Sequence, residues 1–156
     1  MSPYPNLRAR RSAYCGPVSD AARVDDRFAM ARVAHLATAD ASGMPHVVPV
    51  TFALVDDRIV TVVDGKPKSS QRLKRLANIA VNPKVSLLVD HYDEDDWSAL
   101  WWVRVDGRAH ITPNGPVHDA GVRALRAKYS QYRDGVQSGG PLIVIDAGRV
   151  SAWSAS

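Results

Sequence analysis

The sequence lacks most of the features that mark membrane proteins, secreted proteins and disulfide-rich proteins. Its 156 residues include one cysteine, Cys15, which cannot form an internal disulfide or a cysteine-rich metal site. No stretch of eighteen consecutive apolar residues occurs, so no membrane-spanning helix is expected. The arginines near the N-terminus are followed by no continuous apolar run, which argues against a secretory signal. These absences favour a cytoplasmic protein that does not bind membranes.

Several catalytic motifs are also missing. The chain has no G-x-G-x-x-G, no Walker sequence and no G-x-S-x-G. It therefore lacks the motifs typical of nucleotide-triphosphate chemistry and of nucleophilic hydrolysis. His35 and His46 would face each other if a hairpin turned near Asp40, but no third ligand accompanies them and no metal site is expected. If the protein is an enzyme, its chemistry is therefore expected to come from a bound cofactor.

The composition is that of an ordinary globular domain. Hydrophobic residues make up 46% of the chain and charged residues 23%, with 10 glycines and 10 prolines. Residues 1–19 have no periodicity and are predicted to form an irregular N-terminal segment. No linker divides the remainder, so residues 20–156 are predicted to form one domain.

Positive charge is concentrated in one block. The net charge is only +4, but residues 66–84 hold six basic side chains and no acid. Five acids then follow within residues 90–96. A nucleic-acid surface is not expected to carry so many acids beside its basic patch. The pattern favours a local anion site next to a solvated loop, and no nucleic-acid partner is expected.

The residue pattern predicts a mainly β protein. A helix is expected over residues 20–32, with Ser19 as its N-cap, and further helices over 69–77 and after 115. At least six short strands are expected, joined by tight turns, which favours a small Greek-key barrel over a βαβ sheet. The expected extended segments are 34–40, 46–55, 58–64, 84–92, 97–111, 141–147 and 149–154. The interior of so small a barrel is filled by side chains, so a large ligand must bind outside it or between subunits.

The segment DGKPKSS, residues 64–70, is the strongest candidate site. It ends a strand, turns at glycine and enters a helix that Ser69 or Ser70 can cap. Lys66 and Lys68 supply mobile positive charge, and the first N–H groups of the helix lack intrahelical acceptors. A phosphate group suits this combination of amide donors, helix dipole and cations. An ordinary strand–helix connection with solvated lysines is the alternative interpretation.

The segment WWVRVDG, residues 101–107, is expected to form a strand with two different faces. Trp101, Val103 and Val105 suit a core or an interface. Trp102 points to the opposite side, where it would flank a planar ligand or pair across subunits.

Four segments together resemble a known family. HLATADASGMPHVVPVTF, DGKPKSS, NPKVSLLVDHY and WWVRVDGRA, in this order and spacing, resemble the pyridoxamine-phosphate-oxidase-like split β-barrel flavoproteins. They resemble more closely the actinobacterial branch of F420-dependent oxidoreductases, over roughly residues 25 to 155. The resemblance implies a six-stranded antiparallel split β-barrel (Greek key) with a few short peripheral helices. It also implies a homodimer with two cofactor sites at the subunit interface.

The resemblance also implies the positions that contact the cofactor. The backbone of the strand at residues 47–51 would pass along the ring system, and Thr61 with residues 66–70 would bind the phosphate. Trp102 stands where the oxidases have a polar cofactor contact, a glutamine. The implied cofactor residues are Val48, Pro49, Val50, Thr51, Thr61, Lys66, Lys68, Ser69, Ser70 and Trp102. The oxidases end in a Trp…Arg pair, whereas here no arginine follows Trp153, which argues against pyridoxine-phosphate oxidation.

Coenzyme F420 is the expected cofactor, with FMN as the alternative. Both have a tricyclic ring and a phosphate, and the extra basic residues beyond the phosphate loop suit the acidic tail of F420. The expected activity is hydride transfer between reduced F420 and a small unsaturated or conjugated substrate. A non-catalytic protein that binds flavin, F420 or haem on the same fold is the second hypothesis. No catalytic residue can be assigned from the sequence.

Overall fold

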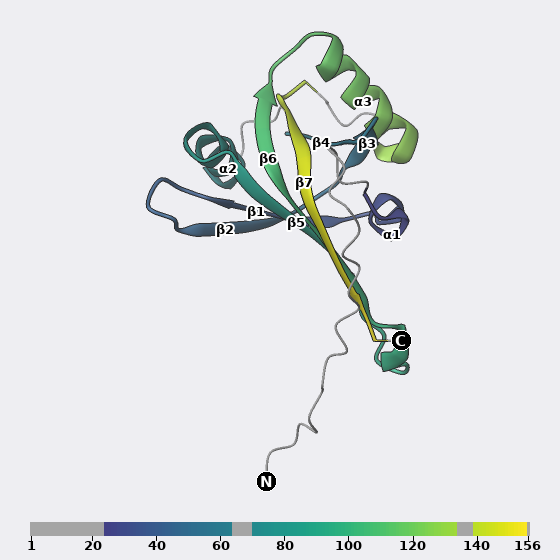
Figure 1. Cartoon of the computed structure of the whole chain (residues 1–156). Helices are drawn as coiled ribbons and strands as arrows, with labels where there is room; N and C mark the ends of the chain where they lie inside the picture. Colours follow the sequence, from purple (N-terminus) through teal and green to yellow (C-terminus); the bar gives the residue numbers. More distant parts are fainter. Residues whose placement is uncertain (1–23, 64–69, 134–138, 156) are drawn as a thin grey trace.

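One antiparallel sheet of seven strands organises the fold, with the strand order β2-β1-β5-β6-β7-β4-β3 (Figure 1). The structure is a computed structural model that describes residues 24–63, 70–133 and 139–155. The strands are β1 (Ala34–Ala39), β2 (Pro45–Val50), β3 (Ala53–Val55), β4 (Arg58–Val62), β5 (Lys84–His91), β6 (Trp101–Thr112) and β7 (Leu142–Ser154). The helices are α1 (Asp26–Met30), α2 (Ser70–Val81) and α3 (Pro116–Lys128), with short 3-10 turns η1 (Trp97–Ala99) and η2 (Ser130–Tyr132).

The sequence prediction of a mainly β, antiparallel split barrel with few helices is confirmed. The strand count is seven rather than the six of the family resemblance, and two of the expected extended segments are divided differently. The run predicted at residues 46–55 is two strands. Strand β2 ends at Val50 and β3 begins at Ala53, with Phe52 buried between them against Phe28. The two C-terminal segments form one strand instead, β7, in which an irregularity opposite Asp106 accommodates one extra residue.

Several predicted boundaries are wrong: α1 ends at Met30 rather than 32, and α2 continues to Val81 rather than ending at 77. Two further differences have a visible cause. The helix predicted at 20–32 begins at Asp26, because the side chain of Asp25 accepts the backbone N–H of Arg27 at 2.8 Å and caps it. The strand predicted from residue 97 begins at Trp101, because Asp96 accepts the backbone N–H of Ser98 and starts a 3-10 turn. Residues 1–19, predicted to be irregular, lie outside the described residues.

The curved sheet buries its core on the concave face. Alternate side chains of the central strands meet there with Phe28 of α1 and Ile79 of α2, which lie at two sides of the barrel. The fully buried side chains of this core include Leu36, Phe52, Ile59, Leu87, Val103, Val105, Ile143 and Ile145. Burial of this apolar surface is the main stabilising contribution to the fold.

Helix α3 covers part of the opposite, convex face. Leu125 of α3 packs against Val60 of β4 and Val144 of β7. At Gly121 the helix lies so close to Leu142 that a Cβ atom would collide with the leucine side chain. Figure 1 shows α3 beside β3 and β4, while the far ends of β5, β6 and β7 project away from the body of the barrel. None of the described helices is long and apolar enough to span a membrane.

Candidate cofactor site

Strand β2 carries three of the predicted cofactor residues and lies at an edge of the sheet. Val48 and Val50 face the core, whereas Pro49 is exposed on the convex face. Within the described residues β2 pairs only with β1, so its second edge has no neighbouring strand. An edge strand presents unpaired backbone N–H and C=O groups. A planar ligand lying along β2 would find hydrogen-bonding partners there.

Thr51, the fourth predicted residue of this stretch, directly follows β2 and is half-buried. Its hydroxyl oxygen lies 2.7 Å from the phenol oxygen of Tyr132 in η2. The neighbouring Tyr129 accepts the backbone N–H of Phe52 at 3.2 Å. The corner between β2 and β3 is therefore held by two phenols from the C-terminal end of α3.

Thr61 lies on strand β4, and residues 64–70, here called the basic segment, follow this strand in the sequence. Thr61 is 2% exposed and lies opposite Ile143 of β7 in the sheet register. Ser70 is the first residue of α2. Three of the predicted phosphate residues lie outside the described residues: Lys66, Lys68 and Ser69. The flanking elements have the predicted order, a strand before the basic segment and a helix directly after it.

Helix α2 is suited to an anion by its charge. It contains no acidic residue, and its first turn begins at Ser70, where the helix dipole favours negative charge. Lys74 is exposed on this helix and close enough to affect Asp40 in the β1–β2 turn. Hydrogen bonds from Ser42 and Met44 lower the pKa of the Asp40 carboxyl, and the charge of Lys74 lowers it further.

His46 of β2 is a site residue that the sequence did not identify. Its Nδ1 atom is buried and has no hydrogen-bond partner among the described residues. In the register it lies opposite Thr38, whose hydroxyl accepts a hydrogen bond of 3.0 Å from Asn78 of α2. The imidazole therefore lies on the side of the hairpin that faces α2, next to the buried Thr38–Asn78 hydrogen bond. The sequence shows a histidine within an expected strand, but it does not show which face of β2 His46 occupies.

The two histidines that a hairpin was expected to bring together are apart. His35 lies opposite Pro49 rather than His46, and its exposed side chain is on the convex face. Across the described residues, no group of three or more His, Cys, Asp or Glu side chains is arranged to hold a metal ion.

Trp102 lies on the convex face of β6, opposite Asp90 and Trp153 on the neighbouring strands. Strands β1 and β5 separate β6 from β2 in the sheet. With strands spaced about 4.8 Å apart, β2 and β6 are roughly 14 Å from each other. One cofactor ring therefore cannot contact both Trp102 and Thr51 of the same chain.

The part of the convex face that no described helix covers is partly apolar. It is formed by β2, β1, β5, the first half of β6 and the second half of β7. Its larger apolar side chains include Val47, Leu88, Trp102 and Trp153. Val47 is 59% exposed, and the polar residues between them form short pairs such as Arg104 with Asp106 at 3.1 Å. Such an apolar surface with polar residues between is typical of an interaction face.

A phosphorylated ring cofactor fits these residues. The unpartnered imidazole nitrogen of His46 and the acid-free helix α2 suit an anionic group. The free edge of β2 suits a planar ring. The free edge and His46 belong to the same strand, β2, of the β1–β2 hairpin.

Comparison with protein families gives a match over nearly the whole described chain. The family model of pyridoxamine 5'-phosphate oxidase matches residues 21–154. A curated relative, a 5a,11a-dehydrotetracycline/5a,11a-dehydrooxytetracycline reductase from Streptomyces rimosus, is 32% identical over 80 residues. That match covers 51% of this chain and 55% of the relative, so the chain spans about half of the relative's length.

Solved structures of similar fold include two with a named ligand. A FAD-binding protein from Mesorhizobium loti has a TM-score of 0.62 at 25% identity, covering 80% of this chain and 85% of that one. HutZ, a haem storage protein from Vibrio cholerae, has a TM-score of 0.63 at 18% identity, covering 83% of this chain and 90% of that one. The second likeness shows the fold alone.

Proposed function

The chain belongs to the pyridoxamine 5'-phosphate oxidase family, and on that basis we propose that it is an F420-dependent oxidoreductase. The substrate class is a small unsaturated or conjugated molecule, which receives a hydride from the reduced cofactor. The relative named as a reductase of 5a,11a-dehydrotetracycline supports this class, because a dehydro compound is an unsaturated one. FMN is the alternative cofactor, supported by the FAD-binding structural neighbour.

The observation that carries the proposal is the acid-free helix α2, which begins where the basic segment ends. Lys66, Lys68, Ser69 and Ser70 would bind the cofactor phosphate at this helix N-terminus. His46 lies on β2 beside the third turn of this helix, because it is opposite Thr38, whose hydroxyl binds Asn78. The buried Nδ1 atom of its imidazole has no hydrogen-bond partner among the described residues.

The ring would lie along Val48–Thr51 at the free edge of β2. Backbone groups of that edge would hold it in place, because they have no strand partner among the described residues. Thr61 is 2% exposed and lies on β4, five positions from β2 in the sheet order, so it would not contact the ring at this edge within one chain. The bound cofactor supplies the hydride chemistry, while the protein aligns the ring and excludes water from one face.

A second copy of the chain completes this site in the proposal. Trp102 lies about three strand spacings, roughly 14 Å, from β2 in one chain, so it would reach the ring only from a partner. The uncovered apolar side chains around Val47 and Trp153 supply the surface for such a homodimer. A two-fold arrangement would pair the same face of both copies and create two equivalent sites.

Preference for F420 over FMN is proposed from charge. Lys74 and Arg75 extend the positive charge of the basic segment along α2 without any acid on that helix. The acidic tail of F420 would gain from these cations, whereas FMN has no such tail. The difference in affinity is expected to shrink as salt is added, because exposed charges are screened.

Titration of the purified protein with F420 and with FMN tests the proposal, with binding followed by fluorescence or calorimetry. Tighter binding of F420, together with oxidation of reduced F420 by a conjugated ketone, supports it. Stoichiometric FMN that F420 does not displace would make the protein a flavoenzyme instead. Binding without turnover across a panel of acceptors, or binding of haem in preference to both, would indicate a carrier protein.

A further inference from the structure

Two tyrosine hydroxyls contact the corner between β2 and β3, and they bind different groups. Tyr129 accepts the N–H of Phe52 and lies 3.0 Å from the Phe52 carbonyl and 2.9 Å from that of Arg32. Its single proton goes to one of these two carbonyls. The hydroxyl of Tyr129 is therefore fully occupied by backbone groups, and its task is to hold the chain at Phe52.

Tyr132 contacts a side chain instead. Its hydroxyl lies 2.7 Å from the hydroxyl of Thr51, and either oxygen can be the donor. The rings of Tyr129 and Tyr132 pack edge to face with centroids 5.9 Å apart, which fixes the position of the second phenol. The Thr51–Tyr132 pair is thus set in place by Tyr129 and by the end of α3.

The Thr51–Tyr132 pair has one hydroxyl proton more than its own hydrogen bond uses. Two hydroxyls carry two protons, and one proton is used in the hydrogen bond between them. No other hydrogen-bond partner is found for either hydroxyl in the described part of the chain. One O–H donor is therefore left over. Because a phenol is the stronger donor of the two, donation from Tyr132 to Thr51 is favoured, and this direction leaves the threonine proton for a ligand.

The remaining O–H donor lies next to the proposed ring site. Thr51 directly follows the Val48–Val50 stretch at the free edge of β2. Both partners of the pair are half-buried, so a hydrogen bond formed there is less exposed to competing water. The complementary ligand atom is an acceptor, such as a carbonyl oxygen or an unprotonated ring nitrogen of a planar heterocycle.

We propose that Tyr132 is a positioning residue for the cofactor, because its phenol orients the Thr51 hydroxyl to donate to an acceptor atom on the ring. This inference rests on the proposed function, since it needs a ring along β2. Tyr132 itself touches neither ring nor substrate in this arrangement. It acts only through Thr51, and this dependence can be tested.

A double-mutant cycle is the test, with F420 and FMN as the two probes. Tyr132→Phe is expected to weaken binding roughly threefold to tenfold, the effect of one neutral hydrogen bond. Thr51→Val should have a similar effect. In the Thr51→Val background, Tyr132→Phe should cause no further loss, because the hydroxyl on which it acts is gone. Thr51→Ser keeps the hydroxyl and should restore wild-type affinity.

The absorption spectrum of the bound ring gives a second readout. A donor to a ring acceptor shifts the absorption maximum, and both single variants should lose this shift equally. Tyr129→Phe is the matched control, because it removes a phenol hydroxyl three residues away that contacts backbone only. It should lower the melting temperature, and it should leave the shift of the absorption maximum in place, because the hydroxyls of Thr51 and Tyr132 both remain.

The outcomes separate the two levels of the proposal. A wild-type protein that binds neither probe overturns the proposed function and this inference with it. A wild-type protein that binds, with additive effects of Tyr132→Phe and Thr51→Val or unchanged affinity, overturns the inference alone. If Tyr132→Phe fails to fold, comparison of Thr51→Val with Thr51→Ser still decides whether the threonine hydroxyl reaches the ring.

Discussion

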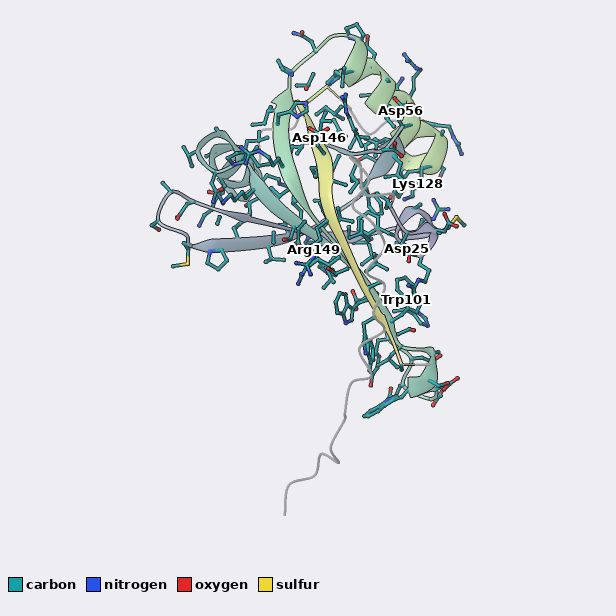
Figure 2. All side chains as sticks on the ribbon, in the orientation of Figure 1. Asp25, Asp56, Trp101, Lys128, Asp146 and Arg149 are labelled. Carbon is teal, nitrogen blue, oxygen red and sulfur yellow. The ribbon has the colours of Figure 1, made fainter. Side chains whose placement is uncertain are left out.

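The ammonium group of Lys128 lies 3.8 Å from the centre of the Phe52 ring. The same group donates to the carbonyl of Ala29 at the end of α1, while the guanidinium of Arg32 donates to the carbonyl of Lys128 at the end of α3. Each helix therefore has its C-terminus capped by a cation from the other segment, which opposes the negative end of the helix dipole. Figure 2 shows Lys128 beside the ribbon of α3, near α1.

This arrangement predicts a pH dependence of stability. Burial, with a smaller contribution from the charge of Arg32, lowers the pKa of Lys128 to about 8. Between pH 8 and pH 10 the unfolded chain keeps this proton while the folded chain releases it, so the free energy of unfolding should rise with pH. Chemical denaturation across this interval measures the slope. Lys128→Met should flatten it, whereas Lys84→Met, at an exposed lysine, should leave it in place.

The buried hydrogen bond between Asn78 and Thr38 should contribute measurably to stability. Asn78→Ala leaves the Thr38 hydroxyl buried without its partner, which should cost about 1–3 kcal/mol in urea denaturation. The double variant Asn78→Leu with Thr38→Val removes both polar groups and should recover most of that loss. A loss in the double variant as large as in Asn78→Ala would show that the hydrogen bond is not the cause.

Removal of both lysines from the basic segment should abolish most cofactor affinity. Lys66→Ala with Lys68→Ala should weaken binding roughly a hundredfold, taking the low end of the energy of a charged hydrogen bond for each lysine. The melting temperature should change as little as it does in ordinary surface substitutions. The control is Lys84→Ala with Arg123→Ala, which changes the net charge equally at two exposed positions. Equal affinity in both double variants would place the phosphate elsewhere.

A charge on the uncovered convex face should separate the proposed dimer. Val47 is 59% exposed in a single chain, so Val47→Asp should fold normally and sediment as a 17.0 kDa monomer. Its cofactor affinity should fall as well, because Trp102 of the partner is lost from the site. Val117→Asp, at an exposed valine on α3, should leave the assembly intact. Wild-type protein that sediments as a monomer at micromolar concentration would contradict the homodimer.

Residue periodicity was sufficient to predict most strands, because alternation of buried and exposed side chains directly reflects a sheet with one core face. The break between β2 and β3 was not predictable in this way. The apolar run continues through Phe52, and the strand ends because Tyr129 takes the backbone N–H of Phe52. That contact joins residues 77 apart in the sequence, so no local pattern contains it.

The start of α1 and the role of His46 were missed for similar reasons. Ser19 and Asp25 are both good N-cap residues, and local sequence does not choose between them. His46 becomes a site candidate only when the register places it opposite Thr38, on the side of α2. The basic segment was identifiable because charge, glycine and capping serines are contiguous there. Its side-chain geometry lies outside the described residues.

The position of β7 in the sheet has a consequence for synthesis of the chain. Strand β4 pairs with β7 on one side, through Arg58 opposite Asp146, and its other neighbour is the short strand β3. The β3–β4 hairpin therefore leaves the ribosome long before the strand that joins it to β6. Until β7 emerges, Val60 and Ile59 have no adjoining strand on that side, and the nascent chain exposes an apolar edge open to chaperones or to wrong pairing. Closure of this barrel therefore waits for β7, the last of the described strands.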